Sequence, residues 1–353
     1  MKDSNSKTIL ITIGFPVYNV EKYIEKSLRS ALEQDFQLPY EILVVDDCGT
    51  DGSMAIVRQL QEVHPNGKSI RIIQHDQNRG LGEARNTAIR NAAGKYLLFL
   101  DSDDWLEKNA LTLLYQTSTK NDAEITIGST LKVYENSDKR EAFIYPDMVV
   151  NHIAAGAYLN VYREVTPLVA YWNKLFLVDF VRKSDMFCVH RIMEDVIPDF
   201  RAKVMTNKVA TISDVTLYYN ERSGSIMDTL WDNDKKRQQT IDTTVDILKR
   251  IKQMICQEFN HIDGVYDLYF ANLMRYFFLY EQLGVDAKQY QEVNEIEHNC
   301  MNFIPSLSRL HGRNARLMYL LLRRKEHNRK SFFKAYRFAS SPLGRILKLM
   351  ISL

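Results

Sequence analysis

The chain has 353 residues, of which 45% are hydrophobic and 25% charged, as is typical of a soluble globular protein with one large or two moderate domains. Four widely spaced cysteines without a CxxC pair argue against a disulfide framework and favour a reducing compartment. The longest apolar run, residues 317–322, is too short to cross a bilayer, and the first ten residues lack the apolar core of a signal peptide, so we expect a cytoplasmic protein.

The first hundred residues alternate between strand and helix patterns. Near-continuous apolar runs predict four buried strands, at residues 8–15, 41–47, 70–76 and 95–101. Helical spacing of apolar residues separates them, and Ser53 is a candidate cap for the second helix. This α/β pattern predicts a parallel sheet covered by helices on both faces, with the carboxyl ends of the strands at one edge.

Polar or turn-forming residues follow each of these predicted strands. They are Pro16, Tyr18 and Asn19 after the first strand, Asp46 and Asp47 after the second, His75, Asp76 and Asn78 after the third, and Asp101 and Asp103 after the fourth. A turn and a helix cap would also explain the pair Asp46 and Asp47. Ligands of parallel sheets bind at the carboxyl edge, so the four groups together predict one pocket there.

Three carboxylates crowd the end of the fourth strand, at Asp101, Asp103 and Asp104. Alternate carboxylates at a strand end can both reach a hard cation, so Asp101 and Asp103 are candidate ligands of Mg²⁺ or Mn²⁺. Asp104 is predicted to cap the following helix, with Glu107 as its return partner. The cap would explain Asp104 alone and leaves the other two carboxylates for a metal.

Three further features have ordinary structural explanations that must be weighed against a functional role. Glu194 and Asp195 precede an apolar stretch, where acidic residues commonly begin a helix. The sequence "AYWNKLF", residues 170–176, is by default a core aromatic with polar neighbours. Cys48 lies beside the predicted pocket, so a reactive thiol has to be considered, although no His or Cys partner is near in sequence.

The sequence "GLGEARN", which begins at Gly80, resembles a dinucleotide-binding loop only in part. The position of its third glycine is occupied by Arg85, so the hydride-transfer fingerprint fails. Arg79 and Arg85 instead offer cations close to where phosphates would lie.

The second half of the chain changes in character. Residues 124–226 mix strand patterns with loops and a helix-like stretch from Asn151, so we expect the Rossmann-like sheet to gain mixed strands here. Residues 234–336 are mostly helical in pattern. We therefore expect a catalytic domain over residues 1–230 and a helical region over residues 231–353.

In combination, these motifs resemble those of family 2 glycosyltransferases with the GT-A fold. The matching stretches are "ITIGFPVYNVEKYIEKSLRSALEQ", "EILVVDDCGTDGS", "NRGLGEARNTAIRNAAGKYLLFLDSDD", "YWNKLF", "MEDV" and "YYNERSGSI". They follow the order and spacing of the family over residues 8–227. The resemblance implies an inverting transferase that uses a nucleotide-diphosphate-sugar, commonly UDP-linked.

The resemblance also implies a role for each matching residue. Asp101 and Asp103 match the DxD motif, which holds a metal on the diphosphate, and Asp195 matches the catalytic base with Glu194 as its neighbour. Asp47 would bond the uracil ring, and Arg222 would contact the diphosphate. The remaining residues implied to line the donor site are Pro16, Tyr18, Asn19, Asn78 and Arg85.

Departures from the family pattern are small. "DDCGTDGS" stands where "DDGSTDGS" is more usual, and Met193 replaces a frequent Gly, without loss of a charged group. None of the tryptophans lies in the QxxRW motif of processive synthases. The resemblance therefore favours addition of a single sugar over polymer synthesis.

Basic residues concentrate in the tail. Residues 311–353 hold eleven Lys or Arg and one Glu, so of the totals of 46 and 44, 35 basic and 43 acidic residues remain in the body. Aromatic residues alternate with these bases, which predicts an amphipathic helix on the inner face of an anionic membrane, where a lipid-linked saccharide acceptor would lie. A solvated terminal helix is the alternative, and no nucleic-acid-binding module is recognised.

Two other functions fit a sheet edge that binds a nucleotide. One is a sugar-1-phosphate nucleotidyltransferase, which usually begins with a glycine-rich loop that is absent after the first strand here. The other is a nucleotide-sugar-binding protein without catalysis, against which the retention of Asp101, Asp103 and Asp195 argues.

Overall fold

The computed structural model describes residues 8–151, 170–225 and 232–262, together with residues 229, 265 and 269. The chain divides into two compact units, Met1–Ile251 and Lys252–Leu353. The strands are β1 (Ile11–Val17), β2 (Tyr40–Asp46), β3 (Ile70–Gln74), β4 (Tyr96–Phe99), β5 (Trp105–Leu106), β6 (Ile125–Tyr134), β7 (Arg140–Phe143), β8 (Met148–Asn151), β9 (Lys174–Leu177) and β10 (Lys208–Glu221). The helices are α1 (Glu21–Leu32), α2 (Ser53–Val63), α3 (Leu81–Asn91), α4 (Ala110–Asn121), α6 (Val178–Lys183), α7 (Val196–Met205) and α9 (Asp234–Met254), with the 3-10 turn η1 (Gly67–Ser69) and the π-helix η2 (Ile255–Phe259).

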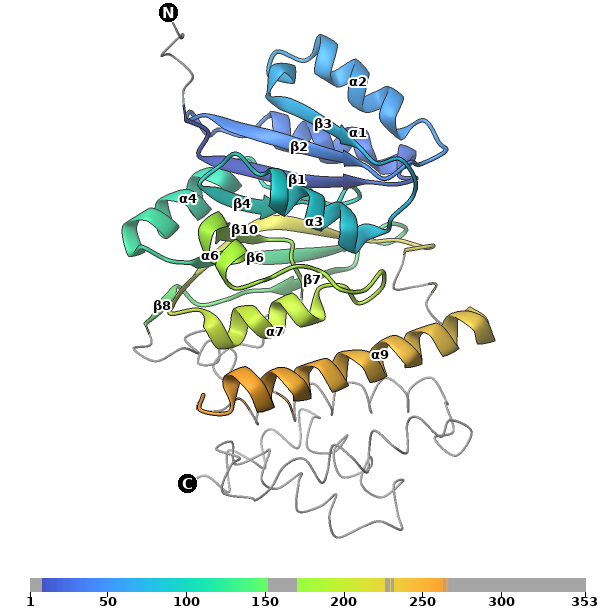
Figure 1. Cartoon of the computed structure of the whole chain (residues 1–353). Helices are drawn as coiled ribbons and strands as arrows, with labels where there is room; N and C mark the ends of the chain where they lie inside the picture. The colour runs from blue at the N-terminus through green and yellow to red at the C-terminus, as the bar shows by residue number, and fades with distance from the viewer. Residues whose placement is uncertain are drawn as a thin grey trace, which may run out of the picture. The chain divides into compact units, whose positions relative to one another are not determined.

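One mixed sheet forms the frame of the first unit (Figure 1). Its order is β3-β2-β1-β4-β9-β6-β10-β5, with β7 beside β6 and β8 beside β10. The four strands predicted in the first hundred residues pair in parallel as β3-β2-β1-β4, so their carboxyl ends share one edge. The predicted α/β fold with a mixed sheet is confirmed, and the predicted C-terminal helical pattern begins with α9.

Two apolar layers cover the faces of this sheet. All seven residues of β1 are buried, because helices lie on both of its sides. One core includes Ile24 and Leu28 of α1, and Leu111 of α4. The other includes Ala88 of α3 and Val181 of α6. Figure 1 shows α3 and α6 on one side of the sheet, and the core residues place α1 and α4 on the other.

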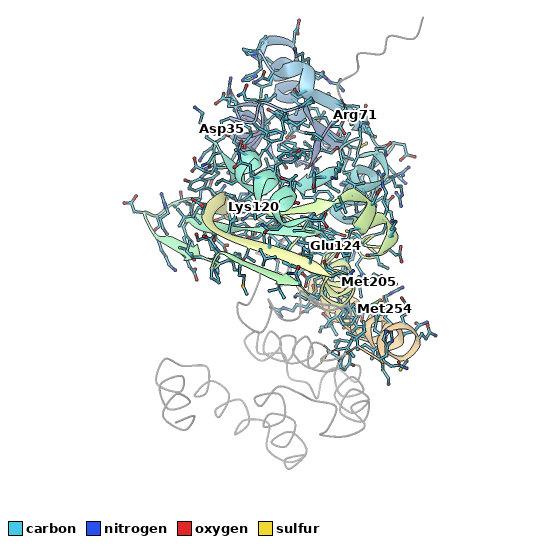
Figure 2. All side chains as sticks on the ribbon, turned by 90° about the vertical axis from the view of Figure 1, so that its left-hand side faces the viewer. Asp35, Arg71, Lys120, Glu124, Met205 and Met254 are labelled. Carbon is cyan, nitrogen blue, oxygen red and sulfur yellow. The ribbon has the colours of Figure 1, made fainter. Side chains whose placement is uncertain are left out.

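The amino edge of the parallel strands is closed by a polar network of its own. Glu41 at the start of β2 accepts hydrogen bonds from the Thr12 hydroxyl at 2.7 Å and from Arg71 Nε at 2.8 Å. The Ala93 N–H donates to the same carboxylate at 3.0 Å. Figure 2 labels Arg71, together with Glu124, which accepts from the Asn207 N–H at 2.6 Å. These polar groups satisfy one another, so the amino edge is structural.

Two predicted caps are wrong. Helix α4 begins at Ala110 after Asn109, and the Asp104 carboxylate accepts instead from the Asn220 N–H of β10 at 2.8 Å. Ser53 is the first residue of its own helix, and its hydroxyl accepts from the Val20 N–H at 2.9 Å, just before α1. In both cases the oxygen serves an element distant in sequence rather than the adjacent helix.

Two predictions fall largely outside the described residues. The helix-like stretch expected from Asn151 begins at the last residue of β8, and the residues that follow it are not described. The basic tail at 311–353 also lies outside the described part of the chain. Within the described part, no helix is both long enough and apolar enough to pass through a membrane.

Candidate active site

The carboxyl edge of the sheet brings the predicted site residues together. Asp47 follows β2 and Asn78 follows β3, while Asp101 and Asp103 follow β4. The register pairs Val17 with Asp46, so the loops after β1 and β2 leave the sheet side by side. The topology therefore places these four polar groups at one edge, as expected.

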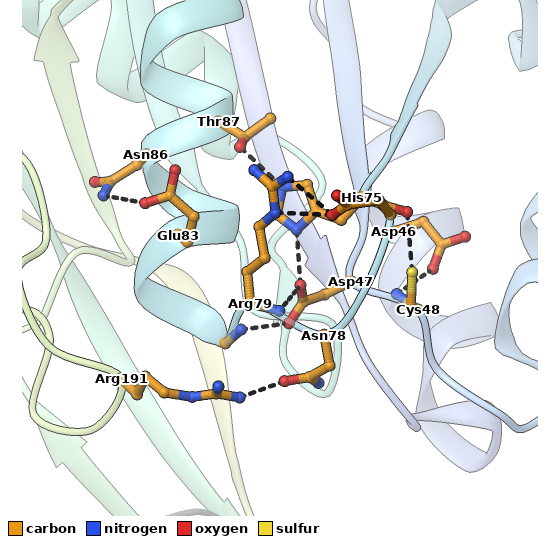
Figure 3. A network of polar contacts seen from close by, with 12 residues as sticks. Asp46, Asp47, Cys48, His75, Asn78, Arg79, Glu83, Asn86, Thr87 and Arg191 are labelled. Atoms are coloured by element: carbon orange, nitrogen blue, oxygen red, sulfur yellow. Dashed lines mark hydrogen bonds and ion pairs between the residues drawn. The ribbon is translucent and has the colours of Figure 1, made fainter.

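Asp47 organises the loop after β3 (Figure 3). Its buried carboxylate accepts from the Arg79 N–H at 2.7 Å and from the Gly80 N–H at 2.8 Å, and lies 2.7 Å from His75 Nδ1. The other ring nitrogen of His75 lies 2.9 Å from the Thr87 hydroxyl of α3. Three acceptor positions of Asp47 are thus occupied by protein groups, which leaves room for one further bond, and its predicted contact with uracil stays a prediction. His75 belongs to the polar group predicted after the third strand, but the family resemblance gave it no role in the site.

The loop after β1 is held by Asn19 and leaves an aromatic ring exposed. Asn19 adopts a left-handed φ of 51°, and its side-chain oxygen accepts from the Thr50 N–H at 2.7 Å. Pro16 pairs with Val45 within the sheet. Tyr18 is 47% exposed, so its ring is available to a planar ligand.

Cys48 does not fit a reactive thiol. Its Sγ lies 2.9 Å from the carbonyl oxygen of His75, to which the thiol donates. Desolvation and the nearby carboxylates of Asp46 and Asp47 raise the pKa of the Cys48 thiol, which disfavours the nucleophilic thiolate. The alternative that Cys48 is a nucleophile is therefore not supported.

Arg85 joins the two acidic motifs of the predicted site. Its guanidinium, on α3, is almost fully buried and contacts both oxygens of Asp101, at 2.8 and 3.0 Å. It also forms an ion pair with Glu194, 109 residues further along the chain. Burial alone would lower the pKa of Arg85, but these two carboxylates raise it, so the guanidinium stays charged. This arrangement makes Arg85 a link between the carboxylates rather than a free phosphate ligand.

Asp103 forms an ion pair with Arg222, the last of the residues predicted to bind the nucleotide-sugar donor. Arg222, just beyond β10, places Nε and one terminal nitrogen each 2.7 Å from Oδ2 of Asp103. The guanidinium also lies 4.8 Å from the centre of the Tyr23 ring. Burial and the charge of Asp101 raise the pKa of Asp103, against the effect of Arg222. Arg222 thus already serves as a counter-ion at the point where a diphosphate is expected.

The carboxylates of Asp101 and Asp103 fit a divalent cation. Their side chains are 21% and 22% exposed, and Oδ1 of Asp103 accepts no hydrogen bond from the described residues. The described residues contain no group of three or more His, Cys, Asp or Glu that could hold a metal ion. A cation here would take two protein ligands and the rest from phosphate and water, which is the usual coordination of Mg²⁺ in nucleotide sites.

Glu194 and Asp195 lie at the start of α7, as the sequence predicts. Asp195 is the residue before the first helical turn, and Glu194 is buried against Arg85. Burial raises the pKa of Glu194, and the charge of Arg85 opposes that rise. Because Arg85 also binds Asp101, the start of α7 is held next to the end of β4.

A cavity of about 450 Å³ lies between the loop after β3 and the loop before α7. Arg79 and Arg191 line it from opposite sides, and Arg191 donates a hydrogen bond to the side-chain oxygen of Asn78 (Figure 3). Asn86 of α3 fixes the second loop, because its side chain bonds both the N–H and the carbonyl of Cys188. The cavity therefore has two arginines, an amide and the Glu83 carboxylate at its rim, and Arg79 is also paired with Asp76, so the lining suits a polar ligand.

The mixed sheet with acidic groups at its carboxyl edge agrees with the expected GT-A fold. The model of Glycosyl transferase family 2 matches residues 12–183. Glycosyltransferase GlyG of Streptococcus pneumoniae serotype 4 is 30% identical over 234 residues, which are 63% of this chain and 74% of GlyG. The chain belongs to glycosyl transferase family 2, so the predicted family is confirmed.

Other relatives match a smaller part of their own length. Glycosyltransferase GlyA of Streptococcus pneumoniae serotype 4 is 30% identical over 223 residues, 61% of this chain and 31% of GlyA. Poly(ribitol-phosphate) beta-N-acetylglucosaminyltransferase TarS of Staphylococcus aureus is 28% identical over 227 residues, 60% of this chain and 36% of TarS. The crystal structure of S. aureus TarS 1–349 in complex with UDP-GlcNAc superposes with a TM-score of 0.72 at 20% identity, over 95% of this chain and 93% of that one. The last likeness supports the fold.

Proposed function

We propose that this glycosyltransferase transfers one sugar, with inversion, from a UDP-linked donor to a saccharide or lipid-linked acceptor in surface polysaccharide biosynthesis. The observation that carries this proposal is the double contact of Arg85, which binds Asp101 of the DxD motif and Glu194 beside the proposed base. A donor held at Asp101 would thus have a carboxylate of the residues just before α7 next to its reacting sugar. The TarS crystal structures with UDP-GlcNAc and with UDP support a UDP-linked donor.

The acceptor class is proposed from the relatives. The matched proteins include TarS and a poly(ribitol-phosphate) beta-glucosyltransferase of Bacillus spizizenii, both named for a poly(ribitol-phosphate) acceptor. An acceptor hydroxyl of a growing surface glycan or its lipid-linked precursor fits this group of relatives.

In the proposed mechanism, Asp195 accepts the proton of the attacking hydroxyl as it approaches C1 of the sugar, a contribution of ~10²–10⁴ in rate. Attack from the face opposite the diphosphate gives inversion. Arg222 stabilises the negative charge that grows on the leaving diphosphate. A Mg²⁺ or Mn²⁺ ion, when bound at Asp101 and Asp103, would supply Lewis-acid stabilisation of the same charge.

The proposal is tested by two substitutions that act on different parts of the site. Asp103→Ala should weaken binding of UDP in the presence of Mn²⁺ by tenfold or more. Asp195→Ala should leave UDP affinity within about twofold of wild type and abolish transfer. Isothermal titration calorimetry measures both affinities, and Asp138→Ala, an exposed aspartate on the β6–β7 loop, is the matched control. Unchanged UDP affinity in Asp103→Ala would refute the metal assignment.

One hydrolysis assay tests both which sugar the donor carries and whether the protein is catalytically active. We expect slow hydrolysis of one member of a panel of UDP-sugars with Mn²⁺, lost in Asp195→Ala. Tight UDP binding without hydrolysis or transfer of any member would instead favour a nucleotide-sugar-binding protein without catalysis.

A further inference from the structure

Lys174 is a buried charged residue that the proposed mechanism leaves unused. It is the first residue of β9, is only 3% exposed, and donates a hydrogen bond to the carbonyl oxygen of Ala170. Removing an ammonium group from water is costly unless anionic partners compensate. A buried lysine at the carboxyl edge of β4, where β9 runs antiparallel to it, therefore requires a physical reason.

The backbone places Lys174 on the α7 side of the sheet. Asn173 adopts a left-handed φ of 56°, which interrupts the alternation of side chains along the strand. Its buried side chain donates to the carbonyls of Gly128 and Ser129 at 2.7 and 3.0 Å, and to the Thr130 hydroxyl at 2.8 Å. These bonds fix the reversal rigidly, so the position of Lys174 is determined by the sheet itself.

A small cavity connects Lys174 with the start of α7. It has a volume of about 10 Å³, close to the space of one water molecule, and both Lys174 and Asp195 line it, as do Asp199 and Tyr171. Asp199 is already paired within α7, since its Oδ2 lies 2.5 Å from Lys203 Nζ. Asp195 is the other carboxylate that faces Lys174 across this cavity.

We propose that Lys174 is a positioning residue for Asp195, whose carboxylate it keeps ionised and oriented at the start of α7. This inference rests on the proposed function, in which Asp195 is the base. An ammonium group nearby favours the ionised form of a carboxylate, which is the form that accepts a proton.

The charge state of Lys174 agrees with this role. Burial lowers the pKa of Lys174 to about 8, while the carboxylates of Asp199 and Asp195 act to raise it. Lys203 of α7 and Arg85 of α3 are the cations that face it and act to lower it. Below about pH 8 the side chain is an ammonium, so it is charged at neutral pH.

The test compares the pH dependence of donor hydrolysis in variants of the 353-residue chain. The substrate is the UDP-sugar that the hydrolysis panel identifies, and Mn²⁺ is present. Lys174→Gln removes the charge but keeps a donor for the Ala170 carbonyl. We expect the acidic limb of its kcat–pH profile to move to a pH about one unit higher, so that kcat on the low-pH side falls about tenfold. The KM for the donor should change less than twofold. Lys203→Gln, a buried lysine of α7 paired with Asp199, is the control and should keep the wild-type limb.

Each outcome decides between defined alternatives. A wild-type acidic limb in Lys174→Gln, or an equal shift in Lys203→Gln, overturns the proposal. If Lys174→Gln does not fold in a thermal melt, Lys174→Arg keeps the charge and should keep the limb, and a limb shifted upward in that variant also overturns it. Asp195→Asn distinguishes failure of the Lys174 inference from failure of the proposed function. An unchanged pH profile in that variant would refute Asp195 as the base and hence the proposed function.

Discussion

Arg85 is the residue on which the organisation of the site depends most. A buried arginine between two carboxylates is stable only while both are present, because each carboxylate compensates part of its desolvation. The Nε of Arg85 is itself buried without a hydrogen-bond partner among the described residues, so its two ion pairs carry the compensation.

Substitution of Arg85 should therefore destabilise the fold strongly. Arg85→Met leaves Asp101 and Glu194 as uncompensated carboxylates, and we expect a loss of about 3–5 kcal/mol in the free energy of unfolding. Arg90→Met, on the same helix, breaks an ion pair with Glu83 in which the arginine is 52% exposed, and should cost less than about 1 kcal/mol. Urea unfolding followed by circular dichroism measures both, and equal losses would contradict the proposed importance of Arg85.

A second prediction at this scale concerns the left-handed backbone of Asn173. Asn173→Gly and Asn173→Ala lose the same side-chain hydrogen bonds, but only alanine is strained at a φ of 56°. We expect Asn173→Ala to be less stable than Asn173→Gly by about 1–2 kcal/mol. Thermal melts of the two variants give the difference directly, and a melting temperature of the alanine variant at or above that of the glycine variant would show that the backbone there relaxes.

At the scale of elements, the sequence predicts correctly the strands and helix starts that depend on local patterns. The first four strands and the start of α7 at Glu194 and Asp195 are found where the hydrophobic periodicity and acidic residues indicate them. Asp101 and Asp103 lie at the carboxyl edge because parallel strands place them there. Each of these predictions needs only a window of about ten residues.

Partners that are distant in sequence were not predictable in this way. Asp104 has every local property of a helix cap, yet it binds a strand 116 residues away. The bond between Arg85 and Glu194 joins separate elements in the same manner. Lys174 gave no signal beyond its place in "YWNKLF", since its burial depends on the reversal at Asn173 and on the packing of α7.

The amino edge of the sheet predicts a pH effect on stability. Burial alone would raise the pKa of Glu41, but hydrogen bonds from Arg71, Ala93 and Thr12 lower it overall. The folded state therefore gains stability above the unfolded pKa of about 4.3, and this gain is lost as the pH falls through the lower folded value. Glu41→Gln should be less stable at pH 7 and should show a flatter decline between pH 5 and pH 3. Urea midpoints at four pH values test this, and parallel curves for the two proteins would exclude the effect.

At the scale of the whole molecule, the basic tail predicts attachment to anionic membranes. Residues 311–353 carry eleven Lys or Arg against one Glu. We expect the full chain to float with vesicles that contain phosphatidylglycerol, and to lose this property without residues 311–353. Salt of about 0.5 M should weaken the attachment, since it screens surface charges. Flotation of the full chain with neutral phosphatidylcholine vesicles to the same extent would contradict an electrostatic origin.

The separation of the two edges of the sheet has a consequence for divergence within the family. Thr12 and Pro16 of β1 are four residues apart, or about 13 Å along the strand. The Glu41 network and the carboxyl edge therefore share no hydrogen bond in the described structure. Changes at partly exposed site residues such as Tyr18 and Asp103 should then combine additively with changes at Glu41. If the proposed function holds, changes at the carboxyl end of the strands would alter the choice of sugar while the amino end preserves the scaffold.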